Sequence, residues 1–290
     1  MKLIAIDLDG TLLNSKHQVS SENEKALHQA RQEGIEVVVS TGRAHFDVAS
    51  ICKPLGMKTW VISANGAAIH DPDGGLFHCE SIEKKRAYEI LSWLEEENYY
   101  YEVFTNRAIY TPHNGRELLN IELDRLTSAN PEADLAVLRQ AAEVQYSQSG
   151  FEYIHSYREL FETEEQIDFF NILGFSFYKE KLEAGWKKFE NETDLTVVSS
   201  ADHNFEIAGK RATKGQALER LAKKLGIPMN ETAAVGDSLN DYSMLKAAGK
   251  SVAMGNARED IKAITKKTPT NPLQNVSPSN GILNILIMIL

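Results

Sequence analysis

The chain has 290 residues, enough for two domains, and its 42% hydrophobic and 25% charged residues are ordinary for a globular protein. Its formal net charge of -10 is not that of a protein with a basic nucleic-acid-binding face, so we expect no nucleic-acid partner. Cys52 and Cys79 lie far apart and form no Cys-x-x-Cys motif, which favours the reducing cytoplasm, with a disulfide as the alternative. The N-terminus runs directly into a strand pattern, so we expect no signal peptide.

The first apolar run, from Leu3 to Ile6, predicts a buried strand that Asp7 and Asp9 follow directly. Open α/β sheets bind their ligands beyond the carboxyl ends of their strands, so both carboxylates stand where a ligand would lie. Gly10 indicates a turn, with Asp7 at the strand tip and Asp9 folded back over it. One carboxylate could then attack a substrate while the other carries a proton. The alternative is an Asp-Gly turn that carries two solvated acids.

Four further apolar runs end in small or polar residues, as the strands of a parallel sheet do. They are residues 37–39, 60–62, 233–235 and 251–254. Ser21 and Glu24 predict a capping box for a helix that ends near Gly34. Thr213 predicts the cap of a second helix, which stops at Gly226. This alternation predicts an α/β fold whose polar residues collect on one rim of the sheet.

The middle of the chain, from about Ile82 to Ala208, is richer in aromatic and charged residues. Its pattern predicts a helix from Arg86 to Glu97 and two hairpins, at residues 99–110 and 195–207. We therefore predict a Rossmann-like parallel-sheet core of residues 1–81 and 209–290, with an inserted α+β domain of residues 82–208.

The C-terminal segment after Lys267 contains no charged residue, and Gly281 to Leu290 is almost wholly apolar. This run is too short to span a bilayer, which needs about 20 residues, so we expect no membrane partner. We expect a terminal strand or helix packed on the core, and a membrane tether is the alternative.

Polar residues at other strand ends complete the candidate site. Thr41 offers a hydroxyl and a backbone N–H, or else caps the next helix. Lys214 opens a helix, where the dipole disfavours a cation, although an ordinary surface lysine is the alternative. Asp237 and Asp241 follow another strand, where an acidic helix-capping turn is the alternative. Crowded carboxylates repel unless a cation joins them, and hard oxygen ligands favour Mg²⁺ over zinc. Together these groups suit phosphoryl transfer.

In this order the motifs resemble the four motifs of the haloacid-dehalogenase-superfamily (HAD) phosphatases. They comprise residues 7–11, 41–43, 214–215 and 236–241. Asn65 to Ala67 and the long insert resemble the Cof-type branch with a type IIB (C2B) cap, and the resemblance runs from Met1 to about Ala263. It implies a HAD-like core with an α+β cap that selects the substrate.

The resemblance implies that Asp7 is a nucleophile that forms an aspartyl phosphate, and that Asp9 protonates the leaving alcohol and then activates water. It implies phosphate-binding roles for Leu8, Thr41, Gly42, Lys214 and Asn240. It implies a Mg²⁺ site of Asp7, Asp237 and the backbone carbonyl of Asp9, with Ser238 assisting. Supporting positions are Arg43, Asn65 and Asp241, the last beside Lys214 or a metal-bound water.

These observations predict a Mg²⁺-dependent phosphatase, a monomer or weak homo-oligomer, that acts on a small phosphorylated metabolite. The family's usual range covers sugar phosphates, nucleotide or flavin-pathway phosphates and pyridoxal phosphate. A phosphosugar mutase is an enzymatic alternative. A non-catalytic ligand-binding regulator is another, against which the intact Asp7, Asp9, Lys214 and Asp237 speak. Because Asp9 is retained, the resemblance favours phosphoester hydrolysis over halide displacement.

Overall fold

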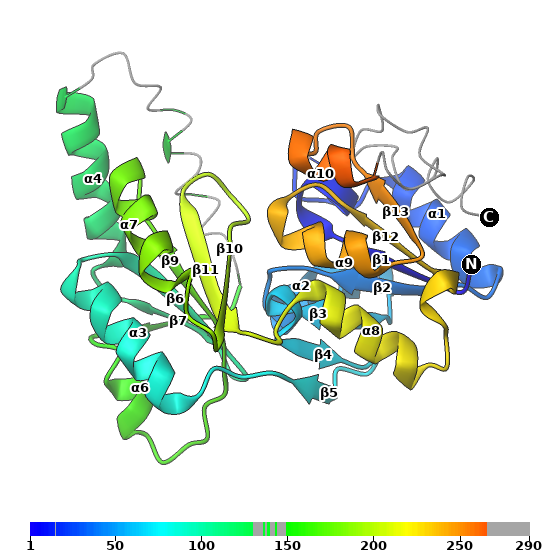
Figure 1. Ribbon diagram of the computed structural model, residues 1–290, viewed down its shortest axis with the longest axis horizontal. Coiled ribbons are helices and arrows are strands. Elements are labelled where there is room, and N and C mark those ends of the chain that lie inside the picture. The colour runs from blue at the N-terminus through cyan, green and yellow to red at the C-terminus, as the bar shows by residue number, and fades with distance from the viewer. Residues whose placement is uncertain (15, 130–135, 137, 140–142, 144–148, 266–290) are drawn as a thin grey trace. The chain divides into compact units, whose positions relative to one another are not determined.

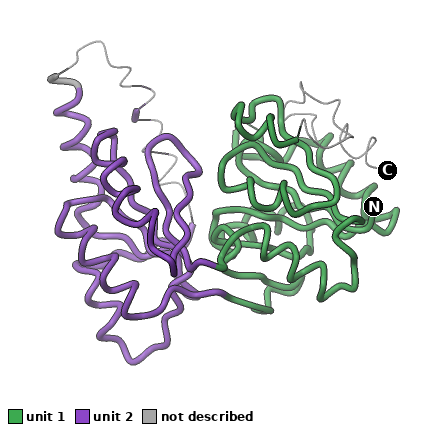
Figure 2. The backbone as a smooth tube through the Cα atoms, viewed as in Figure 1, with its two compact units in different colours: residues 1–79, 211–290 green, residues 80–210 purple. Residues whose placement is uncertain are grey.

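The computed structural model describes residues 1–14, 16–129, 136, 138–139, 143 and 149–265, and the chain divides into two units (Figures 1 and 2). Unit 1 combines residues 1–79 with 211–290, and unit 2 is Glu80–Lys210. Each junction lies two residues from its predicted place. The predicted terminal element at residues 281–290 lies outside the described residues.

Unit 1 contains a seven-stranded sheet in the order β13-β12-β1-β2-β3-β4-β5. All five predicted strands are confirmed, and they are paired in parallel from β13 to β3. Two antiparallel strands, β4 and β5, extend the sheet at one edge, so it is mixed and not wholly parallel. The strands are β1 (Leu3–Ile6), β2 (Glu36–Ser40), β3 (Trp60–Ser63), β4 (Ala68–His70), β5 (Leu76–Cys79), β12 (Thr232–Gly236) and β13 (Lys250–Ala253).

Helices cover both faces of this sheet. Alternate residues of each strand point to opposite faces, so each strand contributes side chains to two separate clusters. In β1, Ile4 and Ile6 belong to the cluster that includes the apolar residues of α1 and α2. Leu3 and Ala5 belong to the other cluster, with residues of α8, α9 and α10. The helices are α1 (Ser21–Gln32), α2 (His45–Cys52), α8 (Lys214–Lys224), α9 (Tyr242–Ala247) and α10 (Glu259–Thr265). The polar strand ends are therefore left at the rim of a sheet whose two faces are filled.

The start of α1 corrects one prediction. The cap is Ser20 and not Ser21, because the Ser20 hydroxyl accepts a hydrogen bond from Asn23 N at 3.1 Å. The predicted cap of α8 is confirmed, since the Thr213 hydroxyl accepts from Gln216 N at 3.2 Å.

Unit 2 contains a six-stranded sheet in the order β10-β11-β9-β6-β7-β8, antiparallel except for the pair β7 and β8. Both predicted hairpins are confirmed, as β6–β7 and β10–β11. The strands are β6 (Tyr100–Thr105), β7 (Ile109–Pro112), β8 (Phe151–Ile154), β9 (Phe169–Phe175), β10 (Leu195–Val198) and β11 (Asn204–Gly209). The helices are α3 (Lys84–Glu96), α4 (Gly115–Ala129), α6 (Glu159–Glu162) and α7 (Lys179–Phe189).

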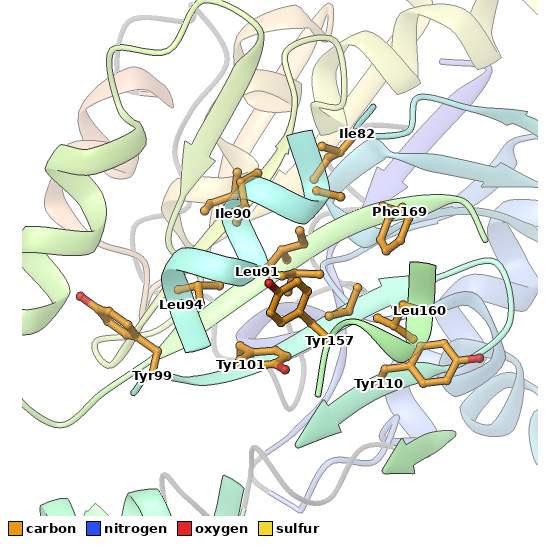
Figure 3. Packing of buried hydrophobic residues seen from close by; sticks show 14 of the residues in the cluster. Ile82, Ile90, Leu91, Leu94, Tyr99, Tyr101, Tyr110, Tyr157, Leu160 and Phe169 are labelled. Atoms are coloured by element: carbon orange, nitrogen blue, oxygen red, sulfur yellow. The ribbon is translucent and has the colours of Figure 1, made fainter. Parts of the chain in front are cut away.

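A separate hydrophobic core holds unit 2 together (Figure 3). From α3, Ile90, Leu91 and Leu94 are fully buried, and they pack in one cluster with Tyr99 and Tyr101. Each fully buried aliphatic side chain contributes about 1.5–3 kcal/mol relative to leaving it exposed. Unit 2 therefore has its own source of stability.

The corrected cap gives a first prediction. Ser20→Ala should lower the free energy of unfolding by about 1 kcal/mol, because the N–H of Asn23 loses its acceptor. Ser21→Ala is the matched control and should change it by less than about 0.5 kcal/mol, since Ser21 is an exposed residue of the helix itself. Urea unfolding measures both changes, and a larger loss of unfolding free energy for Ser21→Ala would show that Ser21 is the cap.

Candidate active site

The N-terminal strand delivers Asp7 to the rim of the unit 1 sheet. β1 ends at Ile6, and Asp7 N still donates to Val235 O of the neighbouring β12 at 3.0 Å, which fixes Asp7 at the tip of the strand. The chain then turns through Leu8–Leu12, where Gly10 has a φ of 77°. The side chain of Leu8 is buried in the core, so only its backbone is available to a ligand.

Lys214 joins three of the motifs through one buried ammonium group. Its side chain is 0% exposed, and Nζ lies 2.8 Å from Asp7 Oδ1 and 2.7 Å from Asp241 Oδ1. Burial alone would lower the pKa of Lys214, but Asp241 and Asp7 outweigh it and raise the pKa. Lys214 is therefore a fixed positive charge, and the alternative of an ordinary surface lysine is wrong.

Asp237 and Asp241 have different surroundings. Asp241 is fully engaged: Oδ1 binds Lys214, and Oδ2 accepts from the backbone N–H groups of Asp237 and Ser238 at 2.9 and 3.0 Å. Asp237 accepts from the Thr11 hydroxyl at 2.9 Å through Oδ1. Asp241 thus holds the loop and the lysine, while Asp237 stays available to a ligand of the site.

Carboxylate oxygens of Asp7, Asp237 and Asp241 all lie within 4.8 Å of one another. Burial raises the pKa of Asp7 well above its usual value, and Asp241 adds to the effect. Burial and Asp241 also raise the pKa of Asp237, to about 7. Three carboxylates against the single ammonium of Lys214 leave two negative charges, which one divalent cation would balance. The donor set therefore fits a hard divalent ion.

Asp9 lies in a different electrostatic environment. Arg43 binds both its carboxylate oxygens, with Nε at 2.7 Å and Nη2 at 2.8 Å, while Nη1 binds Asp47 at 2.6 Å. His17 Nδ1 lies 3.8 Å from the same carboxylate. Partial desolvation of Asp9 opposes ionisation, but the two hydrogen bonds from Arg43 outweigh it and lower the pKa of Asp9, and the nearby His17 adds to the effect. Asp9 is therefore held as an ionised carboxylate.

The remaining candidates lie in loops at the same rim. The Thr41 hydroxyl accepts from Arg43 N at 3.2 Å and caps no helix, since α2 begins four residues later, at His45. Gly42 lies against Asn65, whose side-chain oxygen would be 3.1 Å from a Cβ at that glycine. Asn240 Nδ2 donates to the same oxygen at 3.0 Å. These contacts link the loop after β2, the loop after β3 and the turn after β12.

Ser238 and Asn65 each have one further role. Ser238 Oγ donates to Asn240 Oδ1 at 2.6 Å, so in this structure its hydroxyl serves the turn. Asn65 has a φ of 55° and bonds Thr41 O through its backbone N–H at 3.0 Å. A non-glycine residue in the left-handed region is strained, and the contacts around Asn65 hold it in that conformation.

Sequence reasoning missed two residues of this site. Asn256 Nδ2 donates to Gly10 O at 2.9 Å and lies 3.3 Å from Asp237 Oδ2. Its position three residues after the end of β13, at Ala253, was the available signal. His17, beside Asp9, follows no strand and carried no signal of this kind.

Among the residues that the structure describes, no helix is long and apolar enough to cross a membrane.

Comparison with known proteins connects this geometry with a family. The family model of haloacid dehalogenase-like hydrolases matches residues 4–284. The chain is 78% identical over 264 residues to phosphatase YwpJ of Bacillus subtilis, and the aligned region covers 91% of this chain and 93% of that protein. It is 38% identical over 275 residues to 5-amino-6-(5-phospho-D-ribitylamino)uracil phosphatase YwtE of the same organism, covering 93% of this chain and 95% of that protein.

Solved structures match the fold of this chain over its whole length. A haloacid dehalogenase-like hydrolase from B. subtilis superposes over the whole of both chains, with a TM-score of 0.86 and 71% identity. A sugar phosphatase of HAD subclass IIB also matches over the whole of both chains, with a TM-score of 0.75 and 18% identity, and so shares the fold. The predicted HAD-like fold class is confirmed.

The raised pKa of Asp237 gives a second prediction. Without metal, the folded protein retains a proton on Asp237 up to about pH 7, whereas the unfolded chain releases it near 3.8. The free energy of unfolding should therefore fall as the pH rises from 3.8 to about 7, by at most about 1.4 kcal/mol per pH unit from this group. Urea unfolding in a chelating buffer at several pH values measures it.

Asp237→Asn is the control for this prediction, because it keeps the shape and removes the titrating group. The wild-type protein should lose more stability than the variant over this range. Parallel pH profiles would contradict the raised pKa of Asp237.

Proposed function

Since the chain belongs to the haloacid dehalogenase-like hydrolase family, we propose that it is a cytoplasmic, Mg²⁺-dependent phosphatase that hydrolyses small phosphomonoesters through an aspartyl phosphate on Asp7. The observation that carries the proposal is the buried Lys214 bridge between Asp7 and Asp241, with Asp237 alongside. This arrangement combines a nucleophilic carboxylate, a fixed cation and a divalent-metal site, which phosphoryl transfer requires.

Three residues would hold the metal ion: Asp7 and Asp237 by their carboxylates, and Asp9 by its backbone carbonyl. Asp241 positions this set, because its oxygens already bind Lys214 and two backbone N–H groups. When bound, Mg²⁺ supplies neutralisation of the negative charge on the phosphoryl oxygens and on the attacking carboxylate.

In the first step, Asp7 attacks phosphorus and the bond to the leaving alcohol breaks. Lys214, fixed 2.8 Å from Asp7, orients the carboxylate and offers positive charge to the phosphoryl group. Thr41, Gly42 and Asn240 would hold the phosphoryl oxygens, since their loops are linked at the rim of the sheet.

Asp9 would serve as acid and then as base. To hold a proton for the leaving oxygen it must release Arg43, because the two-point contact keeps the carboxylate ionised. In the second step the ionised carboxylate is the form needed, since it accepts a proton from the water that attacks phosphorus. The bond between Asp7 and phosphorus then breaks, which frees the Asp7 carboxylate and inorganic phosphate. Arg43 thus favours the base form of Asp9.

We place substrate selection in unit 2. The residues above recognise a phosphoryl group and a metal ion, and they are indifferent to the alcohol. Unit 2 has its own core, so its surface can differ between relatives without disturbing unit 1. The name of the 38% identical relative makes ribityl and other sugar-alcohol phosphates the first substrates to test.

The third prediction tests covalent catalysis. The wild-type protein should hydrolyse p-nitrophenyl phosphate with Mg²⁺, and EDTA should stop it. Asp7→Asn should lose turnover entirely, because an amide is not an effective nucleophile toward phosphorus. Asp47→Asn is the control, as it removes a carboxylate that binds Arg43 and is not proposed to bind the phosphoryl group or the metal ion, and it should retain most activity. Circular dichroism checks the fold, and a folded Asp7→Asn protein with wild-type turnover would refute the mechanism.

The fourth prediction concerns Asp9→Asn. Its backbone carbonyl is unchanged, so metal affinity should stay near the wild-type value. Turnover of an alkyl phosphate should fall about 10²–10⁴-fold, because proton transfer to the leaving oxygen is lost. Single-turnover formation of the aspartyl phosphate from p-nitrophenyl phosphate should fall far less, since p-nitrophenolate leaves without protonation. Single-turnover formation of the aspartyl phosphate is measured for both substrates. Equal losses in this rate for the alkyl phosphate and for p-nitrophenyl phosphate would exclude the acid role of Asp9.

A further inference from the structure

Asn256 contacts the carboxylate cluster of unit 1 from a loop outside the four motifs, and the proposed mechanism gives it no task. Its Nδ2 donates to Gly10 O at 2.9 Å and to Asp237 Oδ2 at 3.3 Å. A side-chain amide nitrogen carries two protons, so it can make both contacts at once. Gly10 follows Asp9, whose backbone carbonyl is a proposed metal ligand. One amide group therefore joins the turn that carries one proposed ligand to the carboxylate of another.

The loop that carries Asn256 is tied to the end of β12 on both sides of this residue. Met254 N donates to Gly236 O, and Arg258 N donates to Asp237 O, both at 3.1 Å. These backbone contacts fix the loop relative to Asp237 without the help of the Asn256 side chain. The amide is therefore presented to the carboxylate from an anchored position, and the loop keeps its anchors when the amide is removed.

The carboxylate of Asp237 is held at both oxygens. Oδ1 accepts from the Thr11 hydroxyl at 2.9 Å, and Oδ2 accepts from Asn256. Oδ2 also lies close to the turn after β1, because a Cβ at Gly10 would be only 2.4 Å from it. Each carboxylate oxygen has a further lone pair for a metal ion. Rotation of the carboxylate would break both hydrogen bonds, so together they fix its orientation.

A fixed carboxylate does not suit all divalent ions equally. Mg²⁺ demands near-ideal octahedral geometry with oxygens at about 2.0–2.1 Å, whereas Ca²⁺ accepts six to eight oxygens at about 2.3–2.6 Å in flexible arrangements. Hydrogen-bond partners of a ligating carboxylate typically contribute about 10–100-fold to metal affinity. Holding Asp237 in one orientation therefore favours the ion with the stricter geometry.

We propose that Asn256 is a positioning residue that holds Asp237 in the orientation that Mg²⁺ requires, and that it thereby makes the site select Mg²⁺ over Ca²⁺. It contacts neither the metal ion nor the substrate and acts through Asp237. The inference rests on the metal site of the proposed function, and it does not depend on the aspartyl phosphate.

The test measures binding of the metal alone to the full-length protein, without substrate. Electron paramagnetic resonance of free Mn²⁺ reports Mn²⁺ binding, and displacement by Mg²⁺ or Ca²⁺ gives the Kd of each ion. Asn256→Ala should raise the Kd of Mg²⁺ about 10–100-fold. It should raise the Kd of Ca²⁺ about threefold or less, because Ca²⁺ tolerates an irregular ligand arrangement.

Two further variants frame this result. Asn230→Ala is the matched control, because Asn230 is an exposed asparagine in the turn Met229–Glu231, before β12 and at the opposite end of that strand from Asp237. It should bind both ions like the wild-type protein. Asp237→Asn removes the ligand itself and should strongly weaken Mn²⁺, Mg²⁺ and Ca²⁺ alike. Urea unfolding checks that each variant is folded.

The outcomes separate this inference from the proposed function. An unchanged Kd of Mg²⁺ in Asn256→Ala, or equal weakening of Mg²⁺ and Ca²⁺, would overturn the positioning role and leave the phosphatase proposal intact. A wild-type protein that binds no Mn²⁺, or a folded Asp237→Asn protein that binds it equally well, would overturn both, because the metal site would not include Asp237.

Discussion

A fully buried ammonium group at Lys214 is the constraint on which the rest of unit 1 depends. A charge without water is tolerated only beside well-placed partners, and Asp7 and Asp241 supply them at 2.8 and 2.7 Å. The helix that carries Lys214 must then approach its neighbours closely. A Cβ at Gly215 would lie 2.5 Å from Ser243 O, and one at Gly236 would lie 2.5 Å from the Asp241 carboxylate carbon. Two glycines therefore allow the ion pairs to form.

The turn after β1 also depends on a glycine at a close contact. Gly10 adopts a φ of 77°, and a Cβ there would lie 2.4 Å from Asp237 Oδ2. Its carbonyl accepts from Asn256, which also approaches Asp237. The side-chain amide of Asn256 thus links the turn after β1 to the loop that carries Asp237. The carboxylates of Asp7 and Asp237 are brought together by this contact and not by the sheet alone.

The sequence predicted those parts of the fold that a strong local pattern specifies. Buried parallel strands are continuous apolar runs, which is why β1 was predicted with its observed bounds. The β5 strand begins with the exposed Leu76 and Phe77 and has no alternation, so no pattern marked it. Ser20 and Ser21 carry the same chemical signal, and only backbone geometry distinguishes the cap. The contact of Asn256 with Gly10 joins residues 246 positions apart, beyond any local pattern.

Asp7 and Asp9 are two residues apart, yet their environments push their pKa values in opposite directions. Burial and the carboxylates of Asp241 and Asp237 raise the pKa of Asp7, whereas Arg43 lowers that of Asp9. The excess negative charge therefore gathers around Asp7, and a cation bound there relieves the repulsion and leaves Asp7 ionised. Asp9 has its own counter-ion in Arg43 and needs no metal to stay charged. This separation lets one short loop supply two carboxylates for different tasks, which a shared environment would not allow.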